Sequence, residues 1–165
     1  MTISVLRDIL ISKNQIDKYF EGVTPVNLWR ALNIKHNTHP FGFVEQATVL
    51  SNGRPRSADL KIEMVRGEKW VRVKERPWGI STFDKPGLPP GKDWRYYKIP
   101  KGTLLPRGLA IVRDEHNTRF NAIHYTIAPA SDMPLARFKM LLNQLAQSLE
   151  LLLSITLWYI RILSD

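Results

Sequence analysis

The sequence predicts a single α+β domain over residues 1–165, with an N-terminal helix, about seven short strands and a long C-terminal helix. Three observations carry this prediction. A chain of 165 residues has the length of one ordinary domain and can bury a core without disulfides. Eleven prolines and nine glycines divide it into short segments, which excludes a helical bundle or a coiled coil. From residue 134 onward, apolar residues recur every three or four positions, as in an amphipathic helix.

The first third of the chain predicts one helix, one strand and a loop. Apolar residues of 3–21 fall on one side of a helix that ends at Gly22. Residues 26–34 form an apolar run typical of a buried strand. Residues 36–46 are predicted as a loop, and Ser51-Asn52-Gly53 is a turn signal.

The middle of the chain predicts a hairpin and then separate strands. Residues 58–65 and 69–75 flank Arg66-Gly67-Glu68, a pattern typical of a hairpin. Proline and glycine crowd residues 85–92, which are predicted as a mobile loop near the functional cleft. The remaining strands are expected over residues 80–83, 94–99, 109–112 and 121–128.

Alternation along residues 121–128 separates the side chains of that strand into two faces. Ile123, Tyr125 and Ile127 share one face, because successive side chains of a strand point to opposite sides. The other face carries Ala122, His124 and Thr126. The segments 79–84 and 121–128 both carry small polar residues on otherwise apolar strands, so we expect them to be adjacent, with Ser81 and His124 in a shared cleft.

The C-terminal part predicts a helix with one apolar stripe. The core is expected over about residues 24–140, followed by an apolar helical tail over 134–165. The stretch 151–163 is apolar nearly all round and is predicted as a buried or partner-covered helix, with self-association and membrane contact as alternatives. The stripe consists of Leu135, Phe138, Leu142, Leu145, Leu149 and Leu152.

Charge and cysteine content exclude several classes of function. The absence of cysteine excludes disulfides, thiolate nucleophiles, zinc fingers and iron–sulfur sites. The four histidines lack metal-ligand spacing with a third ligand, so no metal site is expected. The net charge of +9 indicates an anionic partner, such as nucleic acid, a nucleotide, an anionic membrane or an acidic protein. No classical signal peptide is recognised.

Three short segments bring polar residues onto otherwise apolar strands. Arg30 lies within 28–31, and a buried arginine must pair with a carboxylate or face a cleft, where its planar fork suits a phosphate. Gly79 precedes Ser81 and Thr82, which offer short hydroxyl groups to a ligand. The segment 117–127 brings Asn121 and His124 together, although a single strand histidine is also common as a core residue.

Taken in order, these segments resemble a family of ADP-ribosyltransferase-like toxin effectors of type VI secretion, typified by the second exported effector. The resemblance covers roughly residues 28–140. It rests on Leu-Trp-Arg-Ala at 28–31 and on four later segments, which are GxSxFD at 79–84, KIPKGTLLP at 98–106, DxxNxR at 114–119 and AIHYTIAPASDM at 122–133.

The resemblance implies a split antiparallel β-sheet core of ADP-ribosyltransferase type, with nicotinamide adenine dinucleotide (NAD) as donor. It implies that Arg30 holds a phosphate of NAD, and that Ser81 and Thr82 line the nicotinamide pocket. His124 and Asn121 are expected to bond ribose hydroxyls. Further NAD-binding residues are expected at Gly79, Phe83 and Trp78.

The resemblance also implies an unknown macromolecular acceptor, a cytoplasmic site of action and a neutralising immunity protein as partner. The sequence departs from the common transferase pattern because residues 121–128 contain no Glu. The closest acids, Asp114 and Glu115, are expected on the preceding turn, which leaves open an unusual transferase or an inactive binder. Two alternatives are a basic, aromatic-rich nucleic-acid-binding module without catalysis and an inert module that binds a partner through the apolar stripe.

Overall fold

The computed structural model describes residues 1–35 and 39–164, and the side chains of these residues outside 150–160. Strands dominate the described chain, and every strand pair is antiparallel. The elements are α1 (Leu6–Ser12), the 3-10 turn η1 (Ile16–Lys18), β1 (Tyr19–Phe20), β2 (Leu28–Asn33), β3 (Thr48–Val49), β4 (Pro55–Arg56), β5 (Lys61–Val65), β6 (Glu68–Arg72), β7 (Ile80–Phe83), β8 (Trp94–Ile99), β9 (Leu109–Asn117), β10 (Ala122–Pro129), β11 (Met133–Pro134) and α2 (Leu135–Ser164).

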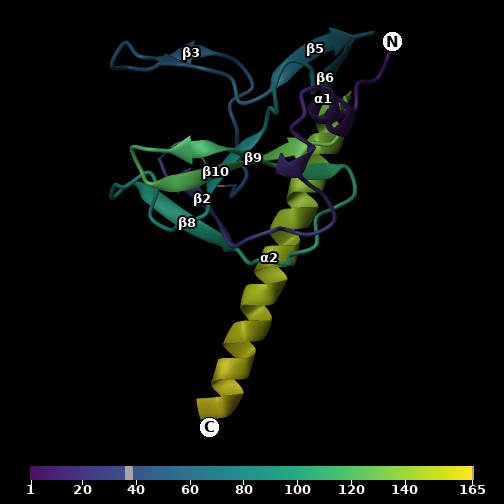
Figure 1. Ribbon diagram of the computed structural model, residues 1–165. Coiled ribbons are helices and arrows are strands. Elements are labelled where there is room, and N and C mark those ends of the chain that lie inside the picture. The colour runs from purple at the N-terminus through teal and green to yellow at the C-terminus, as the bar shows by residue number, and fades with distance from the viewer. Residues whose placement is uncertain (36–38, 165) are drawn as a thin grey trace.

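The strands form three sheets. The largest has six strands in the order β1-β9-β10-β7-β2-β8, and a second has the order β11-β6-β5. A two-stranded sheet, β3-β4, stands apart at one side of the molecule (Figure 1). The expectation of a mostly antiparallel sheet with few helices is confirmed, with the strands divided among more sheets and more short segments than the sequence predicted.

Helix α2 covers one face of the six-stranded sheet. Alternate residues of β9 and β10, including Ile111 and Ile127, pack in one cluster with Phe138 and Leu142 of α2. The predicted stripe is therefore buried as far as Leu149, whereas Leu152 and the side chains of 150–160 lie outside the described residues. The ribbon of α2 continues past the sheets at its C-terminal end (Figure 1).

Helix α1 covers only part of the opposite face. Leu6 and Leu10 pack there against Ala110, Val112 and Ala128, the residues that alternate with the main core positions. The predicted helix over 3–21 is too long, because α1 ends at Ser12. Asn14 has a φ of 55°, a left-handed conformation that Asn tolerates at helix ends, and the chain turns there. The rest of this sheet face is therefore left without a covering helix.

The hairpin expected in the middle of the chain is confirmed. Strands β5 and β6 pair in register around Arg66 and Gly67, which both have positive φ values of 49° and 79°. Two successive left-handed residues are what a tight hairpin turn requires. Strand β9 extends to Asn117, five residues beyond the predicted end at residue 112, so the prediction that Asp114 and Glu115 lie on a turn is wrong.

Candidate functional site

The site begins with the register between β7 and β10. Ser81 lies opposite Thr126, and Phe83 lies opposite His124. Residues two apart on a strand share a face, so these four side chains lie on the sheet face that α1 leaves uncovered. The sequence-based expectation that Ser81 and His124 share a cleft is confirmed, because both line one pocket.

A β-bulge brings a carboxylate into the same group. The β9–β10 register shifts between Ile123 and Tyr125, so that Asp114 and Glu115 together lie opposite His124. Bulges of this kind redirect side chains and are common beside functional sites. Asp114 Oδ2 lies 2.5 Å from His124 Nδ1 and accepts a hydrogen bond of 2.8 Å from Thr126 Oγ1.

This arrangement fixes which ring nitrogen of His124 is available. An ionised carboxylate can only accept, so Nδ1 must carry the proton shared with Asp114. Nε2 then has no hydrogen-bond partner among the described residues. Phe83 packs edge-on to the imidazole, with ring centroids 5.3 Å apart, and Phe120 packs against Phe83 at 5.7 Å. These contacts hold the ring in place, while the His124 and Asp114 side chains stay 26% and 36% exposed.

The pocket around this group has a volume of about 380 Å³. Its floor is the sheet face with Ser81, Asp114, His124 and Thr126. Its walls come from two segments before β7, residues 56–59 and 76–79. Residues distant in sequence thus enclose a carboxylate, an imidazole and two hydroxyls.

Two arginines line the walls and differ in their partners. Arg56 Nη2 lies 3.2 Å from Asp59 Oδ1 in an ion pair. The Arg76 guanidinium lies over the Trp78 ring, 3.9 Å from its centroid, and pairs with no carboxylate of the described residues. Trp78 is itself held by a 3.1 Å hydrogen bond from Nε1 to the Lys74 carbonyl. Arg76 is therefore a positioned cation that is free to meet an anionic ligand.

Gly79 lines the pocket, but its lack of a side chain has a structural reason. A Cβ there would lie 2.0 Å from the carbonyl oxygen of Ile127, a main-chain atom that cannot move aside. Glycine thus permits the close approach of this segment to β10, which brings the 76–79 wall to the site.

Arg30 lies on β2 next to the pocket and does not line it. Its Nη1 donates to the Ser81 carbonyl at 3.0 Å, and Nε and Nη2 donate to the carbonyls of Pro40 and Gly42 at 3.2 and 2.8 Å. Burial lowers the pKa of Arg30 to about 10, with Asp59 opposing that shift, so the guanidinium stays charged at neutral pH. Its partners are three main-chain carbonyls, and neither alternative considered from the sequence anticipated them.

Three other predicted site residues, Phe83, Thr82 and Asn121, do not line the pocket. Phe83 shares the pocket face of β7 but packs against His124. Thr82 is buried on the opposite face of β7 and donates a 2.8 Å hydrogen bond to the Tyr125 carbonyl. Asn121 lies in the β9–β10 turn with a φ of 47°, and its Oδ1 is 3.0 Å from His116 Nε2. The 85–92 segment contains no helix or strand and contributes no lining residue, and its mobility stays a prediction.

The sequence prediction placed Asp114 on a turn and left it out of the site. The alternating pattern of β9 contained the signal, because Ala110 and Val112 face α1 and the next residue in that series is Asp114. The run Arg-Asp-Glu-His at 113–116 is typical of a turn and concealed the strand. Among residues 1–35 and 39–164, no group of three or more His, Asp or Glu could hold a metal ion.

Comparison with known proteins identifies the family. The model of the Tse2 ADP-ribosyltransferase toxin family matches residues 8–151. The chain belongs to this family. The family resemblance inferred from the sequence is therefore confirmed.

One curated relative agrees with this assignment. Toxin Tse2 of Pseudomonas aeruginosa strain PAO1 is 42% identical over 55 residues, which are 33% of this chain and 34% of the relative. The chain thus spans about a third of the relative's length in that match. Within the part of the chain that the structure describes, no helix combines the length and apolar character needed to cross a membrane.

Proposed function

We propose that the protein is an NAD-dependent ADP-ribosyltransferase that acts on an intracellular target, with its site at the pocket of Asp114 and His124. The observation that carries the proposal is the Asp114 carboxylate, held by His124 and Thr126 on an open sheet face. Residues 121–128 lack the Glu of the common transferase pattern, and Asp114 of β9 supplies an acidic group in its place. The split-sheet architecture proposed here corresponds to the division of the strands between the six-stranded and three-stranded sheets.

The residues of the pocket fit a dinucleotide. Arg76, and Arg56 in second place, offer positive charge for a diphosphate, and an arginine fork matches phosphate geometry. Trp78 lines the pocket beside Arg76 and adds an apolar side chain to its wall. Ser81, Thr126 and His124 offer the short polar groups that ribose hydroxyls need. This assignment gives the diphosphate to Arg76, since three of the five N–H groups of Arg30 already bond to carbonyls.

The bond of NAD that would break joins the ribose to nicotinamide, and its cleavage leaves positive charge on the ribose. A preorganised carboxylate stabilises a developing cation without rearranging at the moment of reaction, and we assign this role to Asp114. His124 and Thr126 hold one carboxylate oxygen and fix its direction. Asp114 Oδ1 accepts no hydrogen bond from the described residues, which leaves it open to the pocket.

The remaining residues act as supports in this proposal. Phe83 fixes the His124 ring by edge-on contact. Arg30 ties the loop at Pro40–Gly42 to the main chain of Ser81, and so holds β7 at the pocket. We further propose a cytoplasmic site of action and a neutralising protein partner, both of which follow from toxicity toward an intracellular acceptor.

The test measures NAD binding by calorimetry and nicotinamide release by chromatography. The wild-type protein should bind NAD in a saturable one-to-one manner and release nicotinamide, and His124→Ala should slow release by about 100-fold. His116→Ala is the matched control, because His116 lies on the same hairpin and bonds to Asn121 away from the pocket. Failure of the wild type to bind NAD, or equal loss of release in both variants, would contradict the proposal.

A further inference from the structure

A second cavity lies beyond the wall formed by Trp78 and Arg76. Its volume is about 550 Å³, larger than the Asp114 pocket. Both cavities are lined by Ser57, Ala58, Arg76 and Trp78, so they adjoin along this wall. Neither Asp114 nor His124 lines the second cavity, which we call the β5 cavity.

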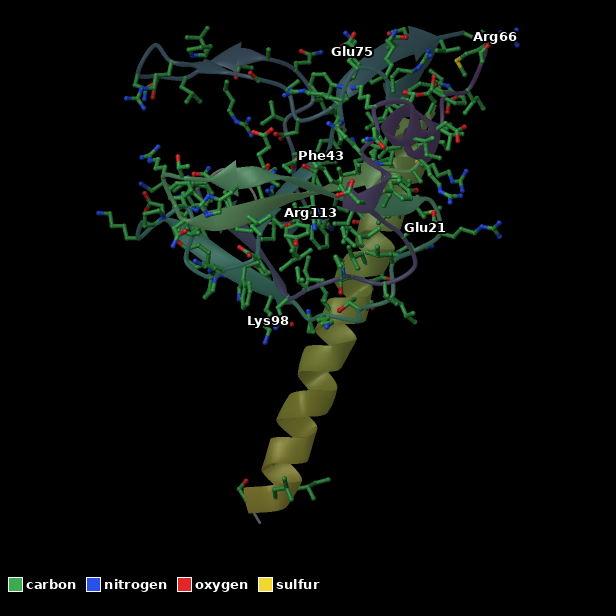
Figure 2. All side chains as sticks on the ribbon, viewed as in Figure 1. Glu21, Phe43, Arg66, Glu75, Lys98 and Arg113 are labelled. Carbon is green, nitrogen blue, oxygen red and sulfur yellow. The ribbon has the colours of Figure 1, made fainter. Side chains whose placement is uncertain are left out.

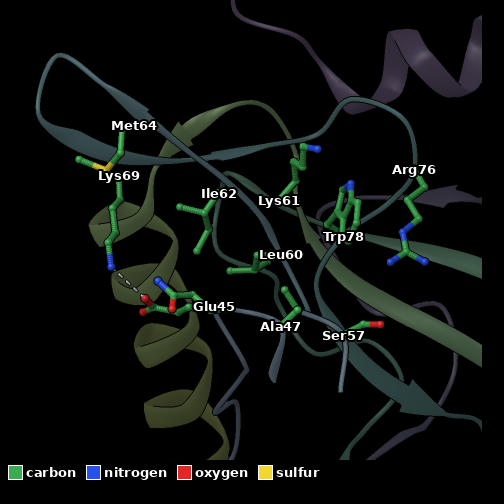
Figure 3. Close-up of a pocket in the computed structure, with 12 residues that line it drawn as sticks. Glu45, Ala47, Ser57, Leu60, Lys61, Ile62, Met64, Lys69, Arg76 and Trp78 are labelled. Atoms are coloured by element: carbon green, nitrogen blue, oxygen red, sulfur yellow. Dashed lines mark hydrogen bonds and ion pairs between the residues drawn. The ribbon is translucent and has the colours of Figure 1, made fainter. Parts of the chain in front are cut away.

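The β5 cavity has an apolar lining that ends on an aromatic ring. Figure 3 shows Leu60, Ile62 and Met64 along one side and Trp78 at the far end. Met64 is 63% exposed, a large apolar side chain that the chain leaves uncovered. The indole of Trp78 is fixed by its hydrogen bond and by Arg76, so the cavity presents a rigid flat wall. Such a wall suits stacking with a planar ring.

The rim of the β5 cavity carries more cations than carboxylates. Lys61 lies 3.6 Å from Glu75, and both Lys69 and Lys139 contact Glu45, at 3.3 and 2.7 Å. Of these charged residues, Lys61, Lys69, Arg76 and Glu45 line the cavity itself, so three cations stand against one carboxylate there. The three lysine side chains are 37–50% exposed, and exposed ion pairs of this kind are weak enough to exchange for a phosphate.

We infer that the β5 cavity binds a base of a single-stranded nucleic acid, whose phosphates contact Lys61 and Lys69. The flat apolar wall can stack with a base, and the cations around the cavity can contact the phosphates on either side of that base. The net charge of +9 also favours binding of a polyanion. This inference rests on the proposed function, since it makes nucleic acid the acceptor. A base held there would bring the adjoining nucleotide to the Asp114 pocket across the shared wall.

The transfer step balances with the groups present. An acceptor nitrogen or hydroxyl oxygen of the strand forms a bond to ribose C1′ as the bond from C1′ to nicotinamide breaks. Nicotinamide leaves as a neutral molecule with the bonding electron pair. The proton of the acceptor passes to His124 Nε2, the ring nitrogen that Asp114 leaves available.

The first experiment measures binding of a fluorescein-labelled, 15-nucleotide single strand by anisotropy. The wild type should bind with an affinity that falls steeply as salt rises. The double variant Met64→Glu, Lys69→Glu should weaken binding at least tenfold, since loss of one stacked base and one phosphate contact is worth about that much. Equal binding by wild type and this variant would overturn the inference.

A matched double variant controls for the change of charge. Met140→Glu, Lys98→Glu makes the same substitutions at an exposed methionine of α2 and at a lysine of β8. Lys98 lies at the opposite end of the sheets from the β5–β6 hairpin, whose turn carries Arg66 (Figure 2). This variant should bind the strand within about twofold of wild type. An equal loss in both variants would show attraction by net charge alone and would also overturn the inference.

The second experiment follows transfer of label from NAD carrying ³²P in its adenylate half. Label should enter the oligonucleotide with wild type and be lost with Met64→Glu, Lys69→Glu, while nicotinamide release without oligonucleotide stays unchanged. Label entering an acidic peptide in place of the oligonucleotide would overturn the inference and leave the proposed function standing. Absence of nicotinamide release by wild type would instead contradict the proposed function. The anisotropy experiment would still show whether the β5 cavity binds a single strand.

Discussion

Asp132 and Asp114 are two carboxylates that the fold uses in opposite ways. The Asp132 side chain is fully buried and accepts 2.8 Å hydrogen bonds from the main-chain N–H groups of Ser4 and Val73. Its Oδ2 also lies 3.1 Å from Arg72 Nε. It joins the N-terminus, the end of β6 and the segment before β11, so both oxygens serve the fold.

Asp114 differs because only one of its oxygens has partners among the described residues. Its side chain is 36% exposed, and the partners of Oδ2 are two side chains, His124 and Thr126. A carboxylate that bonds to main-chain groups fixes the fold, whereas one that bonds to side chains and faces a pocket is available for a ligand. The comparison predicts that stability and activity depend on different acids in this chain.

The largest effect on stability is expected at Asp132. Asp132→Ala leaves two main-chain N–H groups without their buried acceptor and removes a carboxylate that pairs with Arg72, and should lower the free energy of unfolding by about 3–5 kcal/mol. Urea unfolding followed by circular dichroism measures it. A loss below about 1 kcal/mol would show that the N-terminus is held by other contacts.

Arg30 and Arg76 should differ in the same way, because Arg30 supports the fold and Arg76 faces the ligand. Arg30→Ala removes three bonds from a buried guanidinium and should lower stability by about 3 kcal/mol, with Arg30→Lys intermediate. Arg76→Ala should leave stability within about 0.5 kcal/mol and weaken NAD binding about tenfold or more. Thermal melts and calorimetry on the same proteins measure both quantities. If Arg30→Ala kept its stability but lost NAD binding, the result would show that Arg30 binds the phosphate, contrary to the assignment of Arg76.

Thr82 and Thr126 provide the smallest and most closely matched contrast. Each donates one 2.8 Å hydrogen bond, Thr82 to a carbonyl on the core face and Thr126 to Asp114 on the pocket face. Thr82→Val should lower stability by about 1 kcal/mol and leave nicotinamide release intact. Thr126→Val should slow release with a smaller change in stability. The reverse pattern would mean that the site lies on the other face of the sheet.

Local patterns predicted most of what lies within single elements. The period of the α2 stripe, the turn at Arg66 and Gly67 and the two faces of β10 each depend on neighbours in sequence. The loop at Pro40–Gly42 that meets Arg30, and the wall at Arg76 and Trp78, depend on contacts between distant segments. No local pattern encodes such contacts.

Asp114 combined both difficulties. Its charged neighbours resemble a turn, so the strand around it was not predicted. Its partner also depends on the bulge in the pairing of β9 with β10, which shifts the register by one residue and sets two residues against His124. Register between strands is decided by the whole sheet, so the sequence predicted the histidine as a site residue but placed the carboxylate that completes the pair on a turn.

The role of Asp114 is tested most directly by the rate of nicotinamide release from NAD by Asp114→Asn, with Glu115→Gln as control. Both substitutions remove one negative charge from the same bulge and keep the size of the side chain. We expect Asp114→Asn to slow release about 100-fold at unchanged stability, and Glu115→Gln to stay within about twofold of wild type. Release by Asp114→Asn at the wild-type rate would contradict the assignment of Asp114 as the carboxylate of the site.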